Sequence, residues 1–416
     1  MTWYHYITAI AVLSQLVFMY QVCRNFRYAL KKSRKNRCGL YHQTILIIPC
    51  KDKDVNFEEN IASFFNLDNK NYLLWFVVED KADPAYGELC RLREKLASTS
   101  KAKDIQVHIA GKIFPPNNTQ QNNNTKSYSC SQKIHNLLYC YHRIPKDVKI
   151  IAFADSDICV PPHWLNHLIA PLYKSRRGAT TGYRWFVPQK NNLATLALAS
   201  INARIAQLLG DNCFNHAWGG SMAIRVETFR EVGLDKIWPN TVSDDLSLTV
   251  AVKKAGKRVI FAPACLAASH EKTSWKKLFE FGRRQFLITR VCAPRIWWFG
   301  LFSSLYSVFG LWGTAAIAVY AAAIKDKHLY LLAAVPVFFF FSHLIRAILR
   351  QKMAAAILKN EREKMKVAMA MDIIFFWIWS IILLFLAVSS IFGRTITWRG
   401  IRYKLLSPTK TVTVNR

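Results

Sequence analysis

The sequence KIIAFADSDICVPP, residues 149–162, joins a short apolar run to two aspartates that stand one residue apart. The run 149–154 predicts a buried strand, and because side chains alternate along a strand, Asp155 and Asp157 lie on the same face. At the carboxyl end of a strand in an open α/β sheet, both would face the crevice in which ligands bind. Two neighbouring carboxylates repel each other unless a cation lies between them. The pair therefore indicates a site for Mg²⁺ or Mn²⁺, with a solvated turn as the alternative.

The composition favours a protein that works at a membrane. Of 416 residues, 52% are hydrophobic, and 57 lysines and arginines against 26 acidic residues give a formal net charge of +31. This surplus indicates an anionic partner, which is a nucleic acid, an anionic lipid or a phosphorylated substrate. The long apolar segments favour lipid. The ten cysteines are scattered without metal-ligand spacing, which predicts reduced thiols in a domain that faces the cytosol.

Apolar segments near both ends of the chain predict membrane spans. Residues 6–22 carry no charge, are about long enough to cross a bilayer, and are followed at 24–37 by basic residues without any acid. The positive-inside rule therefore places the N-terminus outside and the chain that follows in the cytoplasm. Further apolar segments lie at 296–324, 329–345 and 373–392, so four spans is the simplest count.

The basic segments on either side of the last apolar stretch conflict with that count. Residues 346–366 and the tail after Gly393 are both rich in lysine and arginine, so the positive-inside rule places both in the cytoplasm. A single crossing by 373–392 would put them on opposite sides. Either this segment is re-entrant or the rule fails for the tail, and both readings stay open.

The region between residues 44 and 265 alternates between two patterns. Strand-like apolar runs lie at 44–49, 73–78, 105–110, 149–154 and 258–262. Helix-compatible stretches lie between them at 57–67, 85–98, 131–142, 162–174 and 243–256. Strands that alternate with helices predict an α/β domain with a mostly parallel sheet. The polar, asparagine-rich segment 115–129 predicts a mobile loop.

Polar residues stand where these strands and helices meet. Pro49 and Lys51 end the first strand, and Asp80 follows the second. Lys133 stands near the start of a helix, where it could meet phosphate oxygens, although a solvated lysine is the alternative.

The later junctions add glycines and carboxylates. Gly219 and Gly220 form a turn in which the backbone can approach a ligand closely. Asp244 and Asp245 open a helix with Ser243 before them. A capping role accounts for one of these carboxylates and leaves the other to be explained.

Basic and aromatic residues interleave with apolar ones from His270 to Trp298, which predicts an amphipathic helix in the membrane interface. The expected organisation has six parts. These are a transmembrane anchor at 1–23, a basic linker at 24–43, a catalytic-type α/β domain at 44–270, the interfacial segment at 271–298, a transmembrane region at 299–393 and a basic tail at 394–416.

Taken together, these features resemble the membrane-bound family 2 glycosyltransferases, and within them the ceramide glucosyltransferase branch. Members of that branch carry an Asp, a D-x-D, a third Asp and a (Q/R)-x-x-R-W motif. Asp80 matches the first position, Asp155-Ser156-Asp157 the second and Asp245 the third. The resemblance covers roughly residues 44–292 and the general membrane layout. The last motif departs from the pattern, because its best register is residues 281–285 and retains only Arg284.

The resemblance implies a GT-A type domain, Rossmann-like with a mostly parallel sheet, on the cytoplasmic side of a multi-pass membrane protein. It implies inverting transfer of a hexose from a UDP-sugar to the hydroxyl of a membrane lipid, which is a ceramide-like sphingolipid or a diacylglycerol. The expected cofactor is Mg²⁺ or Mn²⁺, and neither a nucleic acid nor an obligate protein partner is expected.

The matched positions imply roles for individual residues. Asp245 would be the general base, and Asp157 with Asp155 would hold the metal. The residues expected to bind the nucleotide sugar are Asp80, Asp155, Lys133, Arg284, Pro49 and Lys51. Gly219, Gly220 and Asp244 would line the sugar or acceptor pocket.

Two alternatives differ in the acceptor or in the class of protein. A polyprenyl-phosphate sugar transferase or a polysaccharide synthase would share the donor site and differ in its product. A non-catalytic protein that binds membranes or nucleic acid would need the basic surface but not the separate aspartates, and its nucleic-acid affinity would depend strongly on salt.

Overall fold

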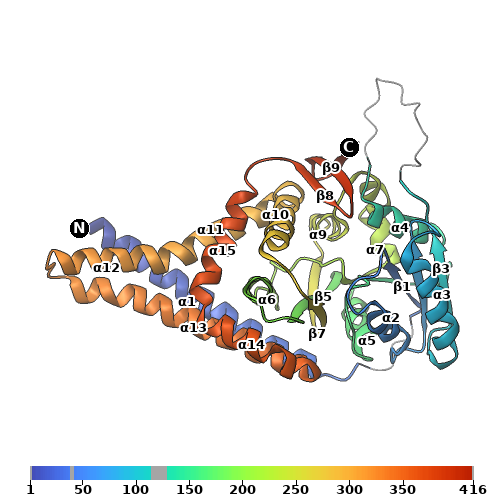
Figure 1. Ribbon diagram of the computed structural model, residues 1–416, viewed down its shortest axis with the longest axis horizontal. Helices are drawn as coiled ribbons and strands as arrows, with labels where there is room; N and C mark the ends of the chain where they lie inside the picture. The colour runs from blue at the N-terminus through green and yellow to red at the C-terminus, as the bar shows by residue number, and fades with distance from the viewer. Residues whose placement is uncertain (1, 38–41, 114–128, 415–416) are drawn as a thin grey trace.

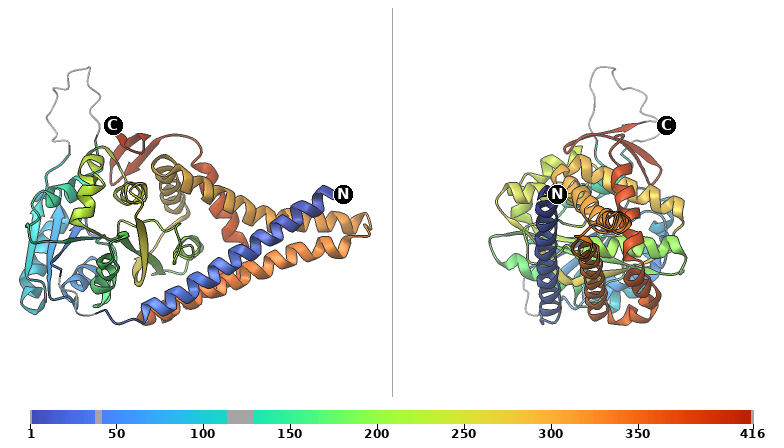
Figure 2. Two further views of the ribbon diagram at one scale, coloured as in Figure 1. Left: turned by 180° about the vertical axis from the view of Figure 1, so that it is seen from behind. Right: turned by 90° about the vertical axis from the view of Figure 1, so that its left-hand side faces the viewer.

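The computed structural model describes residues 2–37, 42–113 and 129–414 and consists of an α/β domain from which a bundle of long helices projects (Figure 1). Helix α1 (Thr2–Ser33) begins toward the far end of the bundle, whereas the last strands lie beside the α/β domain (Figures 1 and 2). Of the asparagine-rich segment predicted to be a mobile loop, residues 115–128 lie outside the described residues.

A seven-stranded sheet with the order β3-β2-β1-β4-β6-β5-β7 forms the centre of the α/β domain. Its strands are β1 (Thr44–Pro49), β2 (Tyr72–Val78), β3 (Asp104–Ile109), β4 (Ile150–Ala154), β5 (Arg177–Pro188), β6 (Ser221–Arg225) and β7 (Arg258–Glu271). Strand β1 is parallel to β2 and β4, whereas β6 is antiparallel to β4 and β5. The predicted α/β class with a mostly parallel sheet is confirmed.

Helices cover both faces of the sheet because its strands are apolar on both faces. Leu46 and Ile48 of β1 belong to one buried cluster, and Ile45 and Ile47 to another. The first cluster includes α2 (Phe57–Phe65), α3 (Pro84–Leu96) and α5 (Trp164–Ile169), and the second includes α4 (Gln132–Tyr141) and α9 (Asp244–Lys254). Strands buried on both sides read as continuous apolar runs, which is why the sequence pattern predicts β1, β2 and β4 well.

The apolar pattern does not predict β5 and β6. Strand β5 contains Gly178 and Gly182, which weaken a strand signal. A Cβ atom at Gly182 would lie 2.2 Å from the carbonyl oxygen of Cys265 on β7, so a glycine is needed for the two strands to approach. Strand β7 is also longer than expected, because it continues to Glu271 beside β5.

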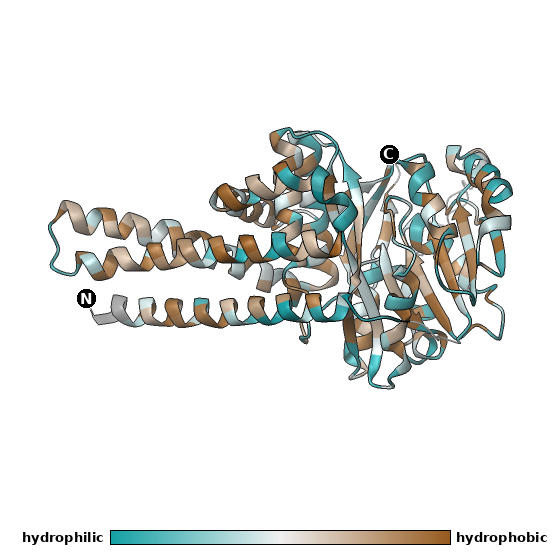
Figure 3. Ribbon diagram, turned by 90° about the horizontal axis from the view of Figure 1, so that it is seen from below, coloured by the Kyte–Doolittle hydropathy of each residue, from teal (hydrophilic) through white to brown (hydrophobic). Residues whose placement is uncertain are grey.

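Among the residues that the structure describes, three helical segments are long and apolar enough to cross a membrane: Tyr6–Ser33, Pro294–Ala323 and Leu329–Ile357. The second comprises α11 (Pro294–Val308), a π-helical turn and α12 (Thr314–Ala323), and the third is α13. Figure 3 shows that these helices are mostly hydrophobic along their length. Residues 24–33, which belong to the expected basic linker, continue α1 without a break.

The last apolar stretch, 373–392, contains α15 (Phe376–Ser389), which meets the preceding helix α14 (Arg362–Ile374) at a bend of 85°. The tail that follows forms a second sheet of β8 (Thr395–Trp398), β9 (Ile401–Ser407) and β10 (Lys410–Val414). This sheet is attached to the α/β domain, since Ser129 N donates to Thr411 O at 2.8 Å. The tail therefore packs against the α/β domain, which is the arrangement that the re-entrant reading of 373–392 expects.

Candidate active site

A cavity of about 620 Å³ lies at the carboxyl ends of β1 and β4, where the strand order of the sheet reverses. Open α/β sheets bind ligands at such a point, because connections from neighbouring strands run to opposite faces there and leave a crevice. The predicted site residues that line the cavity are Pro49, Lys51, Lys133, Asp155, Asp157, Gly219, Asp244, Asp245 and Arg284. Asp80 and Gly220 are not in its lining.

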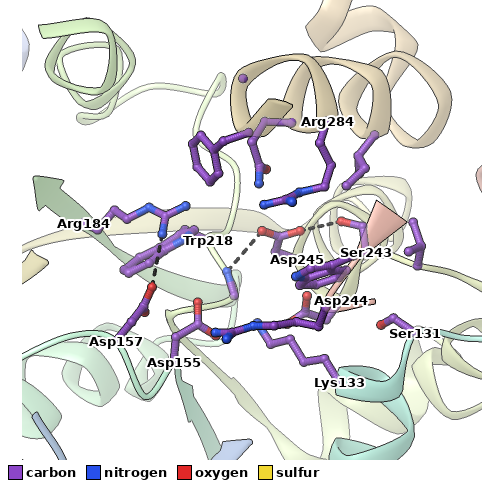
Figure 4. Close-up of a pocket in the computed structure, with 18 of the residues that line it drawn as sticks. Ser131, Lys133, Asp155, Asp157, Arg184, Trp218, Ser243, Asp244, Asp245 and Arg284 are labelled. Carbon is purple, nitrogen blue, oxygen red and sulfur yellow. Dashed lines mark hydrogen bonds and ion pairs between the residues drawn. The ribbon is translucent and has the colours of Figure 1, made fainter. Parts of the chain in front are cut away.

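Asp155 and Asp157 follow β4 and face the cavity together, as the strand geometry predicts (Figure 4). Oδ2 of Asp157 lies 3.6 Å from Nη1 of Arg184. Its Oδ1 is buried and has no hydrogen-bond partner among the described residues. Burial, followed by the charge of Asp155, raises the pKa of Asp157 to about 6. The buried, unpartnered Oδ1 of Asp157 is an oxygen that a further cation could bind.

The donor set fits a hard divalent ion that keeps part of its coordination shell for substrate. No group of three or more His, Cys, Asp or Glu side chains in the described ranges is arranged to hold a metal. Asp155 and Asp157 would supply two carboxylates, and substrate phosphate and water would supply the remaining oxygens. Mg²⁺ commonly binds through one or two carboxylates and substrate phosphates in this way.

Lys133 already places one positive charge among these carboxylates. It lies in the first turn of α4, where Oγ of Ser131 accepts a hydrogen bond from the backbone N–H of Ile134. Its Nζ lies 2.7 Å from Oδ1 of Asp155 and 3.1 Å from Oδ2 of Asp244. Burial lowers the pKa of Lys133, but the two carboxylates outweigh that effect and raise it above its ordinary value.

Asp245 is held by hydrogen bonds at the N-terminus of α9. Its Oδ2 accepts from the backbone N–H of Gly219 at 3.2 Å. Its Oδ1 accepts from Oγ of Ser243 at 2.6 Å and from the backbone N–H of Leu246 at 2.7 Å. These donors fix the carboxylate toward the cavity, and the helix N-terminus favours its negative charge. The neighbouring Asp244 is buried, and that burial raises its pKa to about 6 although Lys133 acts in the opposite sense.

The two glycines before β6 leave room for the charged side chains. A Cβ atom at Gly219 would lie 2.5 Å from Oδ2 of Asp244 and 2.8 Å from Nζ of Lys133. A Cβ atom at Gly220 would lie 2.2 Å from the Trp218 ring and 2.7 Å from Oδ2 of Asp155. Both positions therefore require a glycine, and Gly219 is also part of the cavity lining.

At the end of β2, Glu79 rather than Asp80 lines the cavity. Glu79 lies 2.9 Å from Nζ of Lys51. Asp80 is partly exposed, with Oδ2 2.9 Å from Nζ of Lys112. Hydrogen bonds from the backbone N–H of Ala82 and from Lys112 lower the pKa of Asp80. Asp80 thus follows the cavity-lining Glu79 directly in the chain. Lys112 would have to turn away before Asp80 could contact a ligand in the cavity.

Arg284 faces the carboxylates from α10 (Trp275–Cys292), with its guanidinium 5.5 Å from the Phe281 ring (Figure 4). Gln285 and Phe286 line the cavity beside it. Arg283 points away and donates to the carbonyl of Phe392 at 2.9 Å. The degenerate fifth motif therefore still contributes side chains to the cavity, with Arg284 as its cation.

Three cations of the cavity lining, Arg184, Lys277 and Arg399, are absent from the sequence-based assignment. Arg184 on β5 lies against the rings of Phe186, Trp218 and Phe281 and faces Asp157. The aromatic and basic composition of residues 181–188 is a signal for it. Arg399 enters from the turn between β8 and β9, and no pattern in the tail indicates it.

Apolar side chains from three helices also line the cavity, and we call this part of the lining its apolar end. Leu198, Ile201 and Ile205 contribute from α6 (Leu193–Ala206), and Leu278 and Leu386 contribute from α10 and α15. A cluster of buried side chains joins these three helices. One cavity thus has a charged end and an apolar end.

The family to which the chain belongs is shown by its sequence. The model of glycosyl transferase family 21 matches residues 6–411. No curated protein matches the chain. Similar solved structures include the mannosyltransferase PcManGT from Pyrobaculum calidifontis in complex with GDP-Man and Mn²⁺, at 12% identity and a TM-score of 0.45, covering 92% of this chain and 97% of that one. Another is glucosyl-3-phosphoglycerate synthase from Mycobacterium tuberculosis with phosphoglyceric acid, at 14% identity and a TM-score of 0.32, covering 62% and 85%.

The family match includes the α/β domain, the cavity and the apolar helices on both sides of it. It agrees with the resemblance that the aspartate motifs indicate. The chain therefore belongs to glycosyl transferase family 21 and is a glycosyltransferase.

Proposed function

We propose that this glycosyltransferase transfers a hexose from a UDP-sugar to the hydroxyl group of a membrane lipid, in a metal-dependent reaction that inverts the anomeric configuration. The observation that carries the proposal is the cavity with two unlike ends. Its charged end offers aspartates and cations for a nucleotide diphosphate, and its apolar end offers α6, α10 and α15 for a lipid. A soluble acceptor would have no use for the second end.

The position of the apolar end supports a lipid that stays in the bilayer while it reacts. Helices α6, α10 and α15 share a buried cluster, and α15 also packs against Trp297 and Leu301 of α11, which belongs to a membrane-spanning segment. A lipid could therefore keep its chains in the membrane and extend its headgroup toward Asp245. A ceramide-like sphingolipid and a diacylglycerol both have the hydroxyl group and the chains that this requires. The basic residues around the domain support a cytoplasmic orientation.

Asp245 would act as the general base. The acceptor oxygen attacks the anomeric carbon while the bond from that carbon to the β-phosphate oxygen breaks, and UDP leaves with the electron pair. The hydroxyl proton passes to Asp245, which Gly219 and Ser243 hold in place. A positioned base contributes about 10²–10⁴-fold to the rate. Attack from the face opposite the leaving group converts an α-linked donor into a β-linked product.

Asp155 and Asp157 would hold Mg²⁺ or Mn²⁺, which when bound offsets the charge that grows on the leaving diphosphate. Lys133, Arg184 and Arg284 surround the same space and would bind phosphate oxygens directly. Asp244 would keep Lys133 in position beside the sugar.

Pro49, Lys51 and Asp80 would bind the nucleoside end of the donor, at the carboxyl ends of β1 and β2. Lys51 is held by Glu79, and Asp80 adjoins them. The ribose and uracil carry hydroxyl and amide groups, which hydrogen-bond to carboxylates and lysines.

Product analysis tests the proposal. Membranes that contain the full chain would be incubated with labelled UDP-glucose, UDP-galactose and UDP-N-acetylglucosamine, with and without a chelator, and the lipid products identified by mass. We expect a neutral glycolipid that disappears with the chelator. A polyprenyl-linked product or a polymer would refute the proposed acceptor, and no transfer from any UDP-sugar would refute the proposed donor.

A further inference from the structure

The turn between β8 and β9 reaches into the cavity. Trp398, Arg399 and Ile401 are part of its lining. Arg399 and Gly400 form the turn, and both have left-handed backbone conformations, with φ of 48° and 81°. A two-residue turn with two positive φ angles matches the twist of a hairpin and normally contains asparagine, aspartate or glycine.

An arginine at this position is therefore unfavourable for the backbone. Residues with long side chains adopt left-handed φ values only at an energetic cost, and such outliers concentrate at functional sites. Gly400 meets the requirement of the turn, and Arg399 does not. The side chain of Arg399 accordingly needs an explanation outside the turn.

The hairpin is firmly attached to the α/β domain, so the position of Arg399 is fixed from both sides. The hydroxyl of Tyr403 accepts a hydrogen bond from the backbone N–H of Gln132 at 3.3 Å, and Thr241 donates to the carbonyl of Pro408 at 3.1 Å. Tyr403 and Leu405 are buried against α10. The tip of the hairpin is thus held over the cavity by the same helix that carries Arg284.

The guanidinium of Arg399 lies at the charged end of the cavity. Its Nη2 is 2.9 Å from both carboxylate oxygens of Asp54, and its Nη1 is 3.8 Å from Oδ2 of Asp52. Burial lowers the pKa of Arg399, but Asp54, Asp157 and Asp52 together raise it. Asp54 lines the cavity in the loop that follows β1, on the side where the donor would bind.

We propose that Arg399 is a donor-positioning residue whose guanidinium moves from Asp54 to the diphosphate when the nucleotide sugar binds. This inference rests on the proposed function. The guanidinium fork matches phosphate oxygens as it matches a carboxylate, so one ion pair replaces another. The hairpin would then close the donor end of the cavity and leave the apolar end open to the acceptor.

The location of Arg399 favours the donor over the acceptor as its ligand. The charged groups that act on Arg399 are the carboxylates of the loop after β1 and of Asp157. The apolar side chains of α6 and α15 belong to the other part of the lining. A ceramide-like or diacylglycerol acceptor is neutral at its hydroxyl group and would gain little from a guanidinium.

The test uses the full-length protein in detergent with MnCl₂ and measures the affinities for UDP and for uridine by calorimetry, together with KM and kcat for the UDP-sugar. The variants are Arg399→Ala, Arg399→Asn and Arg399→Lys. The matched control is Arg402→Ala, which removes the same charge from β9 at an exposed position outside the cavity lining. Arg399→Asn suits the left-handed turn, so its melting temperature should equal or exceed that of the wild type.

We expect Arg399→Ala and Arg399→Asn to weaken UDP binding by about tenfold or more, because a charged hydrogen bond is lost, and to leave uridine binding unchanged. KM for the donor should rise more than kcat falls. The UDP affinity of Arg399→Lys should lie between those of these variants and that of the wild type. The UDP affinity of Arg402→Ala should equal that of the wild type. Equal losses for UDP and uridine, or wild-type UDP affinity in Arg399→Asn, would refute this role while the proposed function stands. A wild-type protein that binds no UDP would refute both.

Discussion

Nζ of Lys133 lies 2.7 Å from Oδ1 of Asp155, so the best-defined ion pair of the site joins the helix after the asparagine-rich segment to the D-x-D motif. The same ammonium group faces Asp244 at 3.1 Å. Lys133 therefore partly neutralises Asp155 and Asp244 before any ligand binds. A bound metal would compete with Lys133 for these carboxylates, whereas a phosphate group could bind Lys133 directly.

Replacing Lys133 by methionine should lower the stability of the protein and weaken donor binding. The change leaves Asp155 and Asp244 without their cation, and we expect it to cost about 2 kcal/mol of stability. Breaking a fully buried ion pair costs roughly 3–5 kcal/mol. The smaller value applies here because Asp155 is partly exposed. A drop in melting temperature measures the effect. Lys101→Met, which removes an exposed pair with Asp68, is the control and should melt like the wild type. Equal melting temperatures for Lys133→Met and the control would contradict this account.

Asp245→Asn should lower kcat by about 10²–10⁴-fold and leave UDP affinity nearly unchanged. Asparagine keeps the shape and can still accept hydrogen bonds from Ser243 and Leu246, but it cannot take the proton from the acceptor. Initial rates and calorimetry on the same preparation separate the two effects. Asp147→Asn, at an exposed loop position, serves as the control. Activity near that of the wild type would exclude Asp245 as the base.

Gly219→Ala should strongly reduce activity, because the new methyl group would overlap Asp244 and Lys133. The matched control is Gly87→Ala in α3, where nothing lies within 4 Å of the added Cβ. An exposed helical glycine replaced by alanine stabilises a protein by roughly 0.5–1 kcal/mol, so the control should melt slightly higher and remain active. Comparable rates for the two variants would show that the close approach at Gly219 is not needed.

The dependence of stability and binding on pH should reveal the raised pKa of Asp157. A carboxyl group whose pKa is about 6 when folded and about 4 when unfolded binds more protons in the folded state between those values. For this group alone, stability therefore rises as the pH falls from about 6 to about 4. Asp157→Asn should melt higher than the wild type at pH 7, and this difference should shrink at pH 5. A difference that stays constant with pH would contradict the prediction.

Protonation of Asp157 should also weaken the metal-dependent binding of UDP. The affinity should therefore fall as the pH falls, whereas the contribution of this group to stability rises. A divalent ion needs ionised carboxylates, and burial raises the pKa of Asp157, one of the two proposed ligands, to about 6. We expect the affinity for UDP with Mn²⁺ to decrease as the pH falls below about 6, and the affinity without metal to change less. Calorimetry across this range, at constant ionic strength, measures both.

The bent pair α14–α15 predicts that the C-terminal tail lies on the same side of the membrane as the α/β domain. An epitope tag after Arg416 should be protected from an impermeant antibody in intact cells, whereas a tag inserted at residues 325–328, between α12 and α13, should be accessible. Accessibility of both tags would mean that residues 373–392 cross the membrane.

The sequence by itself determines the parts of this protein whose signals are local. Strands buried on both faces produce continuous apolar runs, so β1 and β4 are predicted correctly, and the two aspartates that follow β4 are found at once. The apolar helices are equally evident, because a bilayer requires long uncharged segments. The position of Asp155 at the cavity follows from the parallel order of β1, β2 and β4.

Only the tertiary structure decides which distant residues complete the site. Strands β5 and β6 bring Arg184 and the glycine turn to the cavity, and their pairing rests on contacts with β4 and β7 rather than on their own composition. The pair formed by Arg399 and Asp54 joins residues 345 positions apart. The tail carries no signal for this contact, because an ion pair across such a separation depends on where β9 packs against α10, which no local pattern encodes.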